Sequence, residues 1–175
     1  MEHAVLARLT NDLEDRDMLP HTMLWFRRGL STQDAMFQLK HHIVDNPTQS
    51  IKSILALDLK KALDNVKHAA ILESIRTLGQ GERMYDYIPD FLTGRRARIA
   101  IGGLEPQDIG IGCTGTPQGS MISPMLFNLV LLGLSRKLAQ IEGLHHSFSA
   151  DDITLWVFKK NDSDEQSLQA AVDAV

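Results

Sequence analysis

The chain has 175 residues, a formal net charge of −4 and an apolar content of 43%, enough for a substantial globular core. This acidic balance is not the profile of an isolated nucleic-acid-binding protein. The single cysteine, Cys113, permits no internal disulfide, and the sequence has no signal-peptide pattern and no apolar run of about 20 residues. We therefore expect an intracellular protein of the cytoplasm or nucleus, neither secreted nor inserted in a membrane.

The N-terminal part of the chain predicts two helices. Residues 2–15 are amphipathic, and a second helix is expected after Ser31, with Asp34 completing a variant capping box and Asn46-Pro47 ending it. The apolar stripe expected on the second helix consists of Ala35, Met36, Leu39 and Ile43.

A short apolar run from Ile54 to Leu57 predicts a buried strand that ends in Asp58. With a period of two, Ile54, Ala56 and Asp58 share one face, and the intervening leucines share the other. A helix is expected to begin at Asp64 or Asn65 and to run through Leu78, closed by Gly79; residues 82–92 predict another.

The second half of the chain predicts two hairpins and two helices. Residues 98–112 are typical of a hairpin. Ser123 and Pro124 are typical of the start of a helix, which is expected to continue to about Ile141. Apolar, β-prone residues on both sides of Asp151-Asp152 predict a second hairpin with the two carboxylates at its tip, and residues 162–175 begin a final helix. These elements together predict an α+β fold, with an antiparallel sheet that carries the acids and helices packed behind it.

The carboxylates are the first candidates for chemistry. Adjacent carboxylates such as Asp151 and Asp152 repel each other, and a hard divalent cation would reverse that cost. Asp58 ends a strand of its own, where a third carboxylate could reach the same cation. Taken separately, Asp58 is more typical of a turn or cap and the Asp-Asp pair of a solvated turn.

The segment from Gly115 to Ser120 (Gly-Thr-Pro-Gln-Gly-Ser) predicts a tight loop that exposes backbone amides around Gln118. An ordinary loop before a buried helix is the alternative. Two further patterns favour plain structural roles: the histidine pairs at 41–42 and 145–146 are expected on the surface or in the core, not as metal ligands, and Cys113 is expected to be an unreactive thiol.

Three segments together resemble motifs A, B and C of the reverse transcriptases of non-LTR retrotransposons: residues 57–66, 115–129 and 149–152. Residues 26–35 are similar to a fingers segment of that family, and residues 91–95 to its segment between motifs A and B. The resemblance covers nearly the whole chain.

The resemblance implies the palm of a right-hand polymerase, with partial fingers and no thumb. Residues 1–50 would be partial fingers, and residues 51–175 mostly palm with a fingers excursion at about 80–112. The implied function is RNA-directed DNA polymerase, which adds dNTPs to the 3′-hydroxyl of a DNA primer on an RNA template. Because thumb and later palm motifs are not in the chain, we expect little or no polymerase activity from the 175 residues alone.

The resemblance also assigns site residues. Two Mg²⁺ ions about 4 Å apart, with Mn²⁺ as a possible substitute, would be held by Asp58, Asp151, the carbonyl of Leu59 and, more weakly, Asp152. The residues implied to contact the nucleotide are Arg27, Lys60, Leu63, Gln118 and Gly119. The basic cluster implied to follow a nucleic-acid backbone, or else to be solvated surface, is Arg95, Arg96 and Arg98.

Three positions depart from the family pattern. Leu63 replaces the Phe or Tyr that blocks a ribose 2′-hydroxyl, so discrimination against ribonucleotides is expected to weaken. Ser149 replaces an aromatic residue, and Trp25 replaces a glycine, which would strain the backbone if a positive φ is required there. These departures keep a second hypothesis open: a catalytically inactive palm-fold remnant of a retrotransposon that at most binds nucleic acid weakly. An RNA-templated RNA polymerase shares the metal site but fits motif B less well.

Overall fold

The computed structural model describes residues 1–27, 29–45, 52–79, 81–99, 107–110, 112–158 and 164–175. Its helices and strands are, in order, α1 (Glu2–Asp15), α2 (Thr32–Leu39), a π-helical segment η1 (Lys40–Val44), β1 (Lys52–Asp58), α3 (Ala62–Asn65), α4 (His68–Thr77), α5 (Glu82–Leu92), β2 (Arg96–Ile99), β3 (Gln107–Gly110), α6 (Ser123–Leu138), β4 (Leu144–Ser149), β5 (Asp152–Phe158) and α7 (Asp164–Ala174). Helices and antiparallel strands are combined, which confirms the predicted α+β class.

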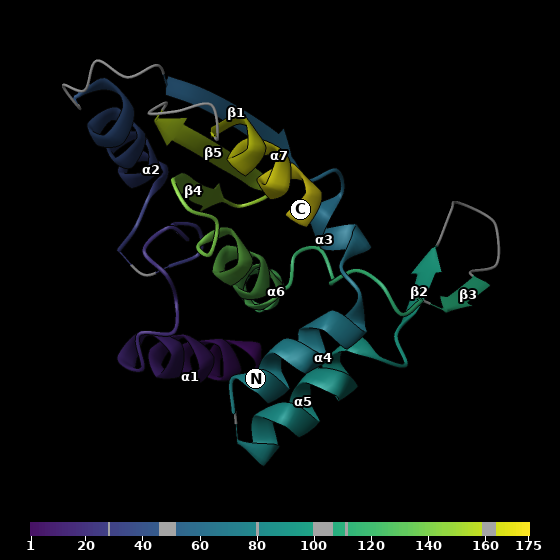
Figure 1. Ribbon diagram of the computed structural model, residues 1–175. Helices are drawn as coiled ribbons and strands as arrows, with labels where there is room; N and C mark the ends of the chain where they lie inside the picture. Colours follow the sequence, from purple (N-terminus) through teal and green to yellow (C-terminus); the bar gives the residue numbers. More distant parts are fainter. Residues whose placement is uncertain (28, 46–51, 80, 100–106, 111, 159–163) are drawn as a thin grey trace.

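The main sheet has three strands in the order β1-β5-β4, and both pairs are antiparallel. The strands β2 and β3 form a separate two-stranded hairpin that projects away from the rest of the molecule (Figure 1). The predicted hairpins at 98–112 and around Asp151-Asp152 are thus both present, although residues 100–106 and 111 lie outside the described part.

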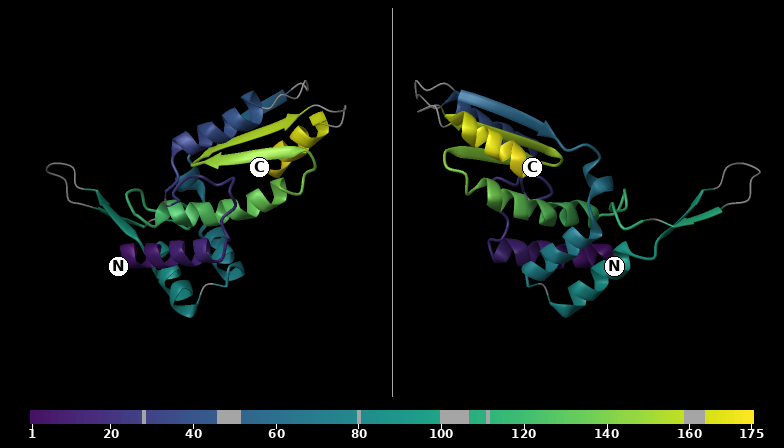
Figure 2. Two further views of the ribbon diagram at one scale, coloured as in Figure 1. Left: turned by 90° about the vertical axis from the view of Figure 1, so that its left-hand side faces the viewer. Right: turned by 45° about the vertical axis from the view of Figure 1, so that its right-hand side comes forward.

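Helix α6 is the centre of the core. It lies between the sheet on one side and a layer made by α1, α4 and α5 on the other, as both views of Figure 2 show. Such a position requires apolar residues on nearly every side of a helix. The sequence of α6 meets this requirement, because ten of its sixteen residues are buried. Pro124 stands in its first turn as expected, but the cap is Ile122 and the helix ends at Leu138.

The two faces of the sheet are unlike each other. Leu55 and Leu57 of β1 pack against the hydrophobic core, whereas Ile54 on the opposite face is 53% exposed. The predicted alternation is therefore confirmed, and β1 is an edge strand with one open face, not the fully buried strand that its apolar run suggested. Asp58 lies on this open face too, because side chains alternate along the strand.

The far end of the open face is covered by η1. His42 of η1 stacks on His145 at a ring distance of 6.0 Å, and His145 stacks on Trp156 at 5.7 Å. Adjacent His145 and His146 point to opposite sides of β4, so the second is buried while the first is in this ring stack. His42 and His145 thus lie in a ring stack at one end of the sheet, and His146 lies in the core.

Two helix predictions are corrected by the structure. The helix expected from Asp64 to Leu78 is split into α3 and α4, because Val66 is extended and Lys67 forms an isolated bridge with Thr114. In α2 the predicted capping box of Ser31 and Asp34 is present, but Met36 is 70% exposed and does not belong to the apolar side. The end expected at Asn46-Pro47 lies outside the described residues. Among the helices described, none combines the length and apolar character needed to cross a membrane.

We expect the stability of the chain to fall as the pH drops below about 6.5. Burial lowers the pKa of His146, whose Nε2 lies 3.0 Å from Ser135 Oγ. The unfolded chain therefore binds a proton at a higher pH than the folded chain does, and stability present above 6.5 is lost as the pH falls toward the folded pKa.

Thermal unfolding across this pH range measures the effect. In His146→Gln the pH dependence should be shallower, whereas in His3→Gln, a change at an exposed position on α1, it should equal that of the original chain. Equal pH dependence in both variants would contradict the assignment to His146.

Candidate functional site

Strand pairing brings the three predicted carboxylates to one end of the sheet. In the β1–β5 pair, Asp58 is directly opposite Asp152, and the Leu59 backbone N–H donates to the Asp151 carbonyl at 3.0 Å. All three aspartates are exposed. The predicted proximity of residues from distant parts of the sequence is thus a direct result of the register.

The Asp151 backbone belongs to a two-residue hairpin loop. Ser149 pairs with Asp152, so Ala150 and Asp151 form the loop, and Ala150 has a φ of +58°. A positive φ at the first loop position is the feature of a type II′ turn, which normally has glycine there. Backbone strain of this kind is often found at functional sites, and here it directly precedes Asp151.

The three carboxylates at this sheet end supply the kind of oxygen donor that a hard divalent cation binds. None of them makes an ion pair with a described residue. Like charges directly opposite each other on a sheet are unfavourable, and a bound cation would relieve that repulsion. In the described parts of the chain, however, no three His, Cys, Asp or Glu side chains converge closely enough to hold a metal as they stand.

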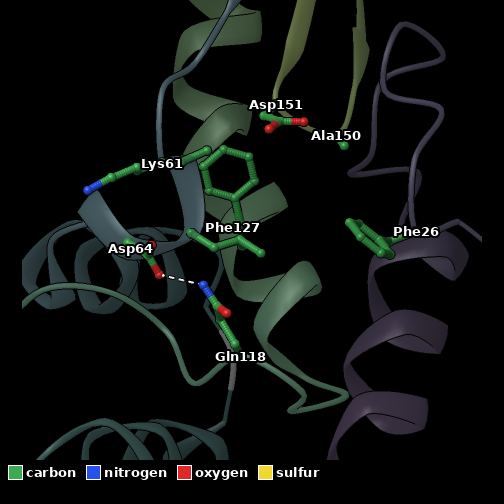
Figure 3. A pocket seen from close by; sticks show the side chains of 9 residues that line it. Phe26, Lys61, Asp64, Gln118, Phe127, Ala150 and Asp151 are labelled. Atoms are coloured by element: carbon green, nitrogen blue, oxygen red, sulfur yellow. Dashed lines mark hydrogen bonds between the residues drawn. The ribbon is translucent and has the colours of Figure 1, made fainter.

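A pocket of about 220 Å³ adjoins Asp151, whereas Asp58 and Asp152 do not line it. We call it the Leu63 pocket, and Figure 3 shows most of its lining. It is lined by Phe26, Lys61, Ala62, Leu63, Asp64, Gln118, Phe127, Ala150 and Asp151. These residues come from four separate segments, so the segments matched to motifs A, B and C and to the fingers all meet around one cavity.

Gln118 is fixed on one side of this pocket. Its Nε2 donates to Asp64 Oδ1 at 2.9 Å (Figure 3). Because the amide nitrogen is committed to Asp64, the carbonyl oxygen of Gln118 remains as an acceptor. Gln118 and Leu63, which were predicted from the resemblance, therefore share a pocket with Asp64, which was not.

The loop that carries Gln118 is fastened to the chain that follows β1. Gly115 N–H donates to the Val66 carbonyl at 2.7 Å, and Thr116 N–H donates to the Leu63 carbonyl at 2.8 Å. The buried His68 adds a contact from its Nε2 to the Gly115 carbonyl at 2.8 Å. These bonds make one wall of the pocket from two segments that are far apart in sequence.

Gly115 is required by this contact. Its φ is +80°, and a Cβ at this position would lie 2.8 Å from the Asp64 carbonyl oxygen. No side chain fits so close to another backbone. The glycine that the sequence suggested for a tight loop is therefore also needed for close approach of the two segments.

The other predicted nucleotide ligands lie elsewhere. Arg27 forms a bidentate pair with Glu14, at 2.9 and 2.6 Å, and also donates to the carbonyls of Leu19 and Pro20. This hydrogen bonding lowers the pKa of Glu14. Lys60 is exposed and lines a different groove, and Gly119 is exposed beside the Leu63 pocket without lining it.

Trp25 does not carry the strain that its position suggested. The residue with a positive φ is Phe26, at +56°, and the Trp25 carbonyl accepts a 2.8 Å hydrogen bond from the buried Asn128. The sequence also gave no indication that Phe26, Lys61, Asp64, Phe127 and Ala150 line the pocket. All of them stand inside the quoted motifs, so adjacency to a motif residue was the available signal.

We expect Gly115→Ala to lower the free energy of unfolding by about 1–3 kcal/mol, because the new Cβ meets the Asp64 backbone and φ is positive. The matched control is Gly133→Ala in α6, where nothing lies within 4 Å and φ is not positive. There alanine should stabilise the helix by up to about 1 kcal/mol. Denaturant unfolding of both variants measures the difference; equal stabilities would contradict the close approach.

Comparisons with known proteins identify the family of the chain. Residues 1–175 match the family described as reverse transcriptase (RNA-dependent DNA polymerase). The chain is 39% identical over 79 residues to the Retrovirus-related Pol polyprotein from type-1 retrotransposable element R2 of Popillia japonica, covering 45% of this chain and 13% of that protein. It is 33% identical over 85 residues to the type-2 R2DM polyprotein of Drosophila melanogaster, covering 49% and 8%.

Among solved structures, apo telomerase from Candida tropicalis, truncated from the C-terminal domain, superposes with a TM-score of 0.73. The identity is 13%, and the match covers 98% of this chain and 36% of the telomerase chain. This likeness concerns the fold alone. Because the family match extends over every residue, the chain belongs to the reverse transcriptase family, whose members are RNA-directed DNA polymerases.

Proposed function

We propose that the chain is the part of an RNA-directed DNA polymerase in which nucleotidyl transfer takes place. The observation that carries the proposal is the position of Asp58, Asp151 and Asp152 at one end of the β1–β5 pair, where Asp151 also lines the Leu63 pocket. The pocket is open to the surface and has Asp151 in its lining, so a nucleotide bound there could turn its reacting phosphate toward the carboxylates.

In this proposal Asp58 and Asp151 hold two Mg²⁺ ions, with Asp152 and the Leu59 carbonyl as further oxygen donors. When bound, such ions supply positive charge to the attacking primer hydroxyl and to the leaving pyrophosphate. The carboxylates themselves contribute by being held at one sheet end. The Ala150-Asp151 turn fixes the backbone of Asp151. The Asp151 carbonyl in turn accepts a hydrogen bond from Leu59, the residue that follows Asp58.

The Leu63 pocket would receive the incoming dNTP. Gln118, bonded to Asp64, would border the base and the templating nucleotide with its free carbonyl oxygen. Leu63 would face the sugar, and Gly119 would let the chain turn beside it with a φ of +85°. Lys60 and Arg27 would contact triphosphate oxygens only in a form in which each has moved; for Arg27 the pair with Glu14 must open first.

The division into subdomains follows the same proposal. The sheet with α6 and α7 would be palm, residues 1–50 partial fingers, and about 80–112 a fingers excursion. The β2–β3 hairpin, which projects from the body (Figure 1), would belong to that excursion. RNA template, DNA primer and dNTPs would be the partners. The chain matches only 13% and 8% of the lengths of the two R2 polyproteins, so the remaining parts of such a protein would supply further grip on the duplex.

A second candidate function is an inactive remnant with the same fold. Two observations favour it: the described carboxylates do not converge as they stand, and Leu63 occupies the pocket position where an aromatic ring is expected. Primer extension with purified chain, primed RNA, dNTPs and Mg²⁺ or Mn²⁺ separates the two. Extension that requires the carboxylates supports the polymerase. Because the 175 residues alone are expected to extend a primer poorly, the remnant is favoured when an R2-type polyprotein that carries these 175 residues in place of its own matching segment folds and also gives no extension.

We expect Asp58→Asn and Asp151→Asn each to remove whatever primer extension the chain performs, because an amide is neutral and cannot replace a carboxylate toward two cations. Asp90→Asn, an exposed change on α5, should leave extension as it was. The folded state of each variant is checked by circular dichroism. Full activity of Asp151→Asn would refute the assigned metal site.

We also expect Leu63→Phe to increase selection of dNTPs over rNTPs by about tenfold or more, because the larger ring would narrow the pocket where the sugar lies. Competition between matched dNTP and rNTP measures the ratio. Leu63→Met, which conserves the volume, serves as the control. An unchanged ratio in Leu63→Phe would place the sugar away from Leu63.

A further inference from the structure

A second pocket lies behind the wall of the Leu63 pocket. It has a volume of about 240 Å³ and is called here the Arg95 pocket. It is lined by Asp64, His68, Leu92, Arg95, Thr114, Gly115, Thr116, Pro117 and Gln118. Asp64 and Gln118 line both cavities, so their hydrogen bond stands between them.

Arg95 differs from the two arginines that follow it. Arg98 donates from Nε to Asp108 at 2.8 Å, and Arg96 lies 3.9 Å from the same carboxylate. Arg95 forms neither a hydrogen bond nor an ion pair with any residue that the structure describes. Its guanidinium lies 4.8 Å above the Phe91 ring, and its Nη1 is buried without a hydrogen-bond partner. Within this basic cluster, Arg95 thus lacks a direct hydrogen-bond or ion-pair partner among the described residues, although its charge helps to lower the pKa of the Glu2 carboxyl.

An arrangement of this kind is unfavourable unless something else accepts the hydrogen bonds. Polar atoms shielded from water nearly always have a hydrogen-bond partner. A guanidinium without an acceptor loses its hydrogen bonds to water and gains none in exchange. The nearby acids are already engaged. Glu2 accepts from Ser120 Oγ and the Met121 backbone, and Asp64 accepts from Gln118. The pocket therefore presents a planar cation, a backbone-lined loop and the Thr114 side chain, which together suit an anionic oxygen ligand.

We propose that the Arg95 pocket binds a phosphodiester of the template RNA strand, next to the nucleotide that is being copied. This inference rests on the proposed function, in which the dNTP occupies the Leu63 pocket and the templating nucleotide lies at Gln118. Gln118 also lines the Arg95 pocket, so the template strand would pass this pocket. A triphosphate belongs beside Asp151, which lines the first cavity and not the second. The phosphate of a strand that passes behind Gln118 reaches Arg95 without approaching the carboxylates.

Binding of a labelled single-stranded RNA to the 175-residue chain, measured by fluorescence anisotropy over a range of salt concentrations, tests the proposal without requiring catalysis. We expect Arg95→Gln to weaken binding about tenfold and to lower the salt slope by about 0.7, the value for one phosphate contact on a single strand. The loss should be the same for RNAs of different sequence, since a phosphate contact carries no base information.

The matched control is Arg96→Gln, which removes the same charge from the neighbouring residue. The sequence grouped Arg96 with Arg95, whereas the inference assigns the phosphate contact to Arg95 and leaves Arg96 as solvated surface. Arg96 is 74% exposed and shares Asp108 with Arg98, so its loss should change affinity less than twofold. Equal effects of the two variants would overturn the inference, as would an Arg95→Gln chain that binds like the original. Absence of RNA binding by the original chain would also overturn it, whereas primer extension separately decides the proposed polymerase function.

If Arg95→Gln does not fold, the unmodified chain answers the same question. Phenylglyoxal modifies accessible arginines, and mass spectrometry reads each site. RNA should slow modification of Arg95 more than that of Arg96. Equal protection of both, or protection of Arg96 alone, would overturn the inference.

Discussion

The antiparallel pairing of β1 with β5 is the constraint on which the rest of the site depends. Its register sets Asp58 opposite Asp152 and bonds Leu59 to the Asp151 carbonyl. Because side chains alternate along a strand, the same register sends Leu55 and Leu57 into the core and leaves Asp58 on the open face. A slip of one residue would exchange these faces and place a carboxylate against α6. Burial of the leucines therefore fixes the position of the acids, although the acids contribute nothing to the core.

The second constraint is the fastening of the Gly115–Gln118 loop to the chain after β1. Backbone hydrogen bonds to Leu63 and Val66, the His68 contact and the Asp64–Gln118 pair make one wall from two segments. That wall separates the Leu63 pocket from the Arg95 pocket. The break between α3 and α4, which the helical pattern of the sequence did not predict, is where this fastening takes place. Local helix propensity is weaker than the sum of these tertiary contacts.

The predictions made from sequence differ in success according to the range of the interaction involved. The capping box of Ser31 and Asp34, the alternation along β1 and the carboxylate hairpin were correct, since each depends on neighbours within a few residues. The prediction that Met36 belongs to the apolar stripe was wrong, because its exposure depends on which side of α2 meets the sheet. The engagement of Arg27 by Glu14 and the positive φ at Phe26 in place of Trp25 were not readable from the motif either. Both arise where distant parts of the chain meet.

The amino-acid sequence by itself determined the mixed helix and antiparallel sheet class, the candidate carboxylates and the membership of the reverse transcriptase family, because these depend on local pattern and motif order. Only the tertiary structure decided which side chains share a cavity, which arginine of the basic cluster lacks a partner, and why Gly115 must be glycine. The reason is physical: each of these depends on a distance between residues separated by tens of positions. Such distances are set by how α6, the sheet and the loops pack together, and no short segment specifies them.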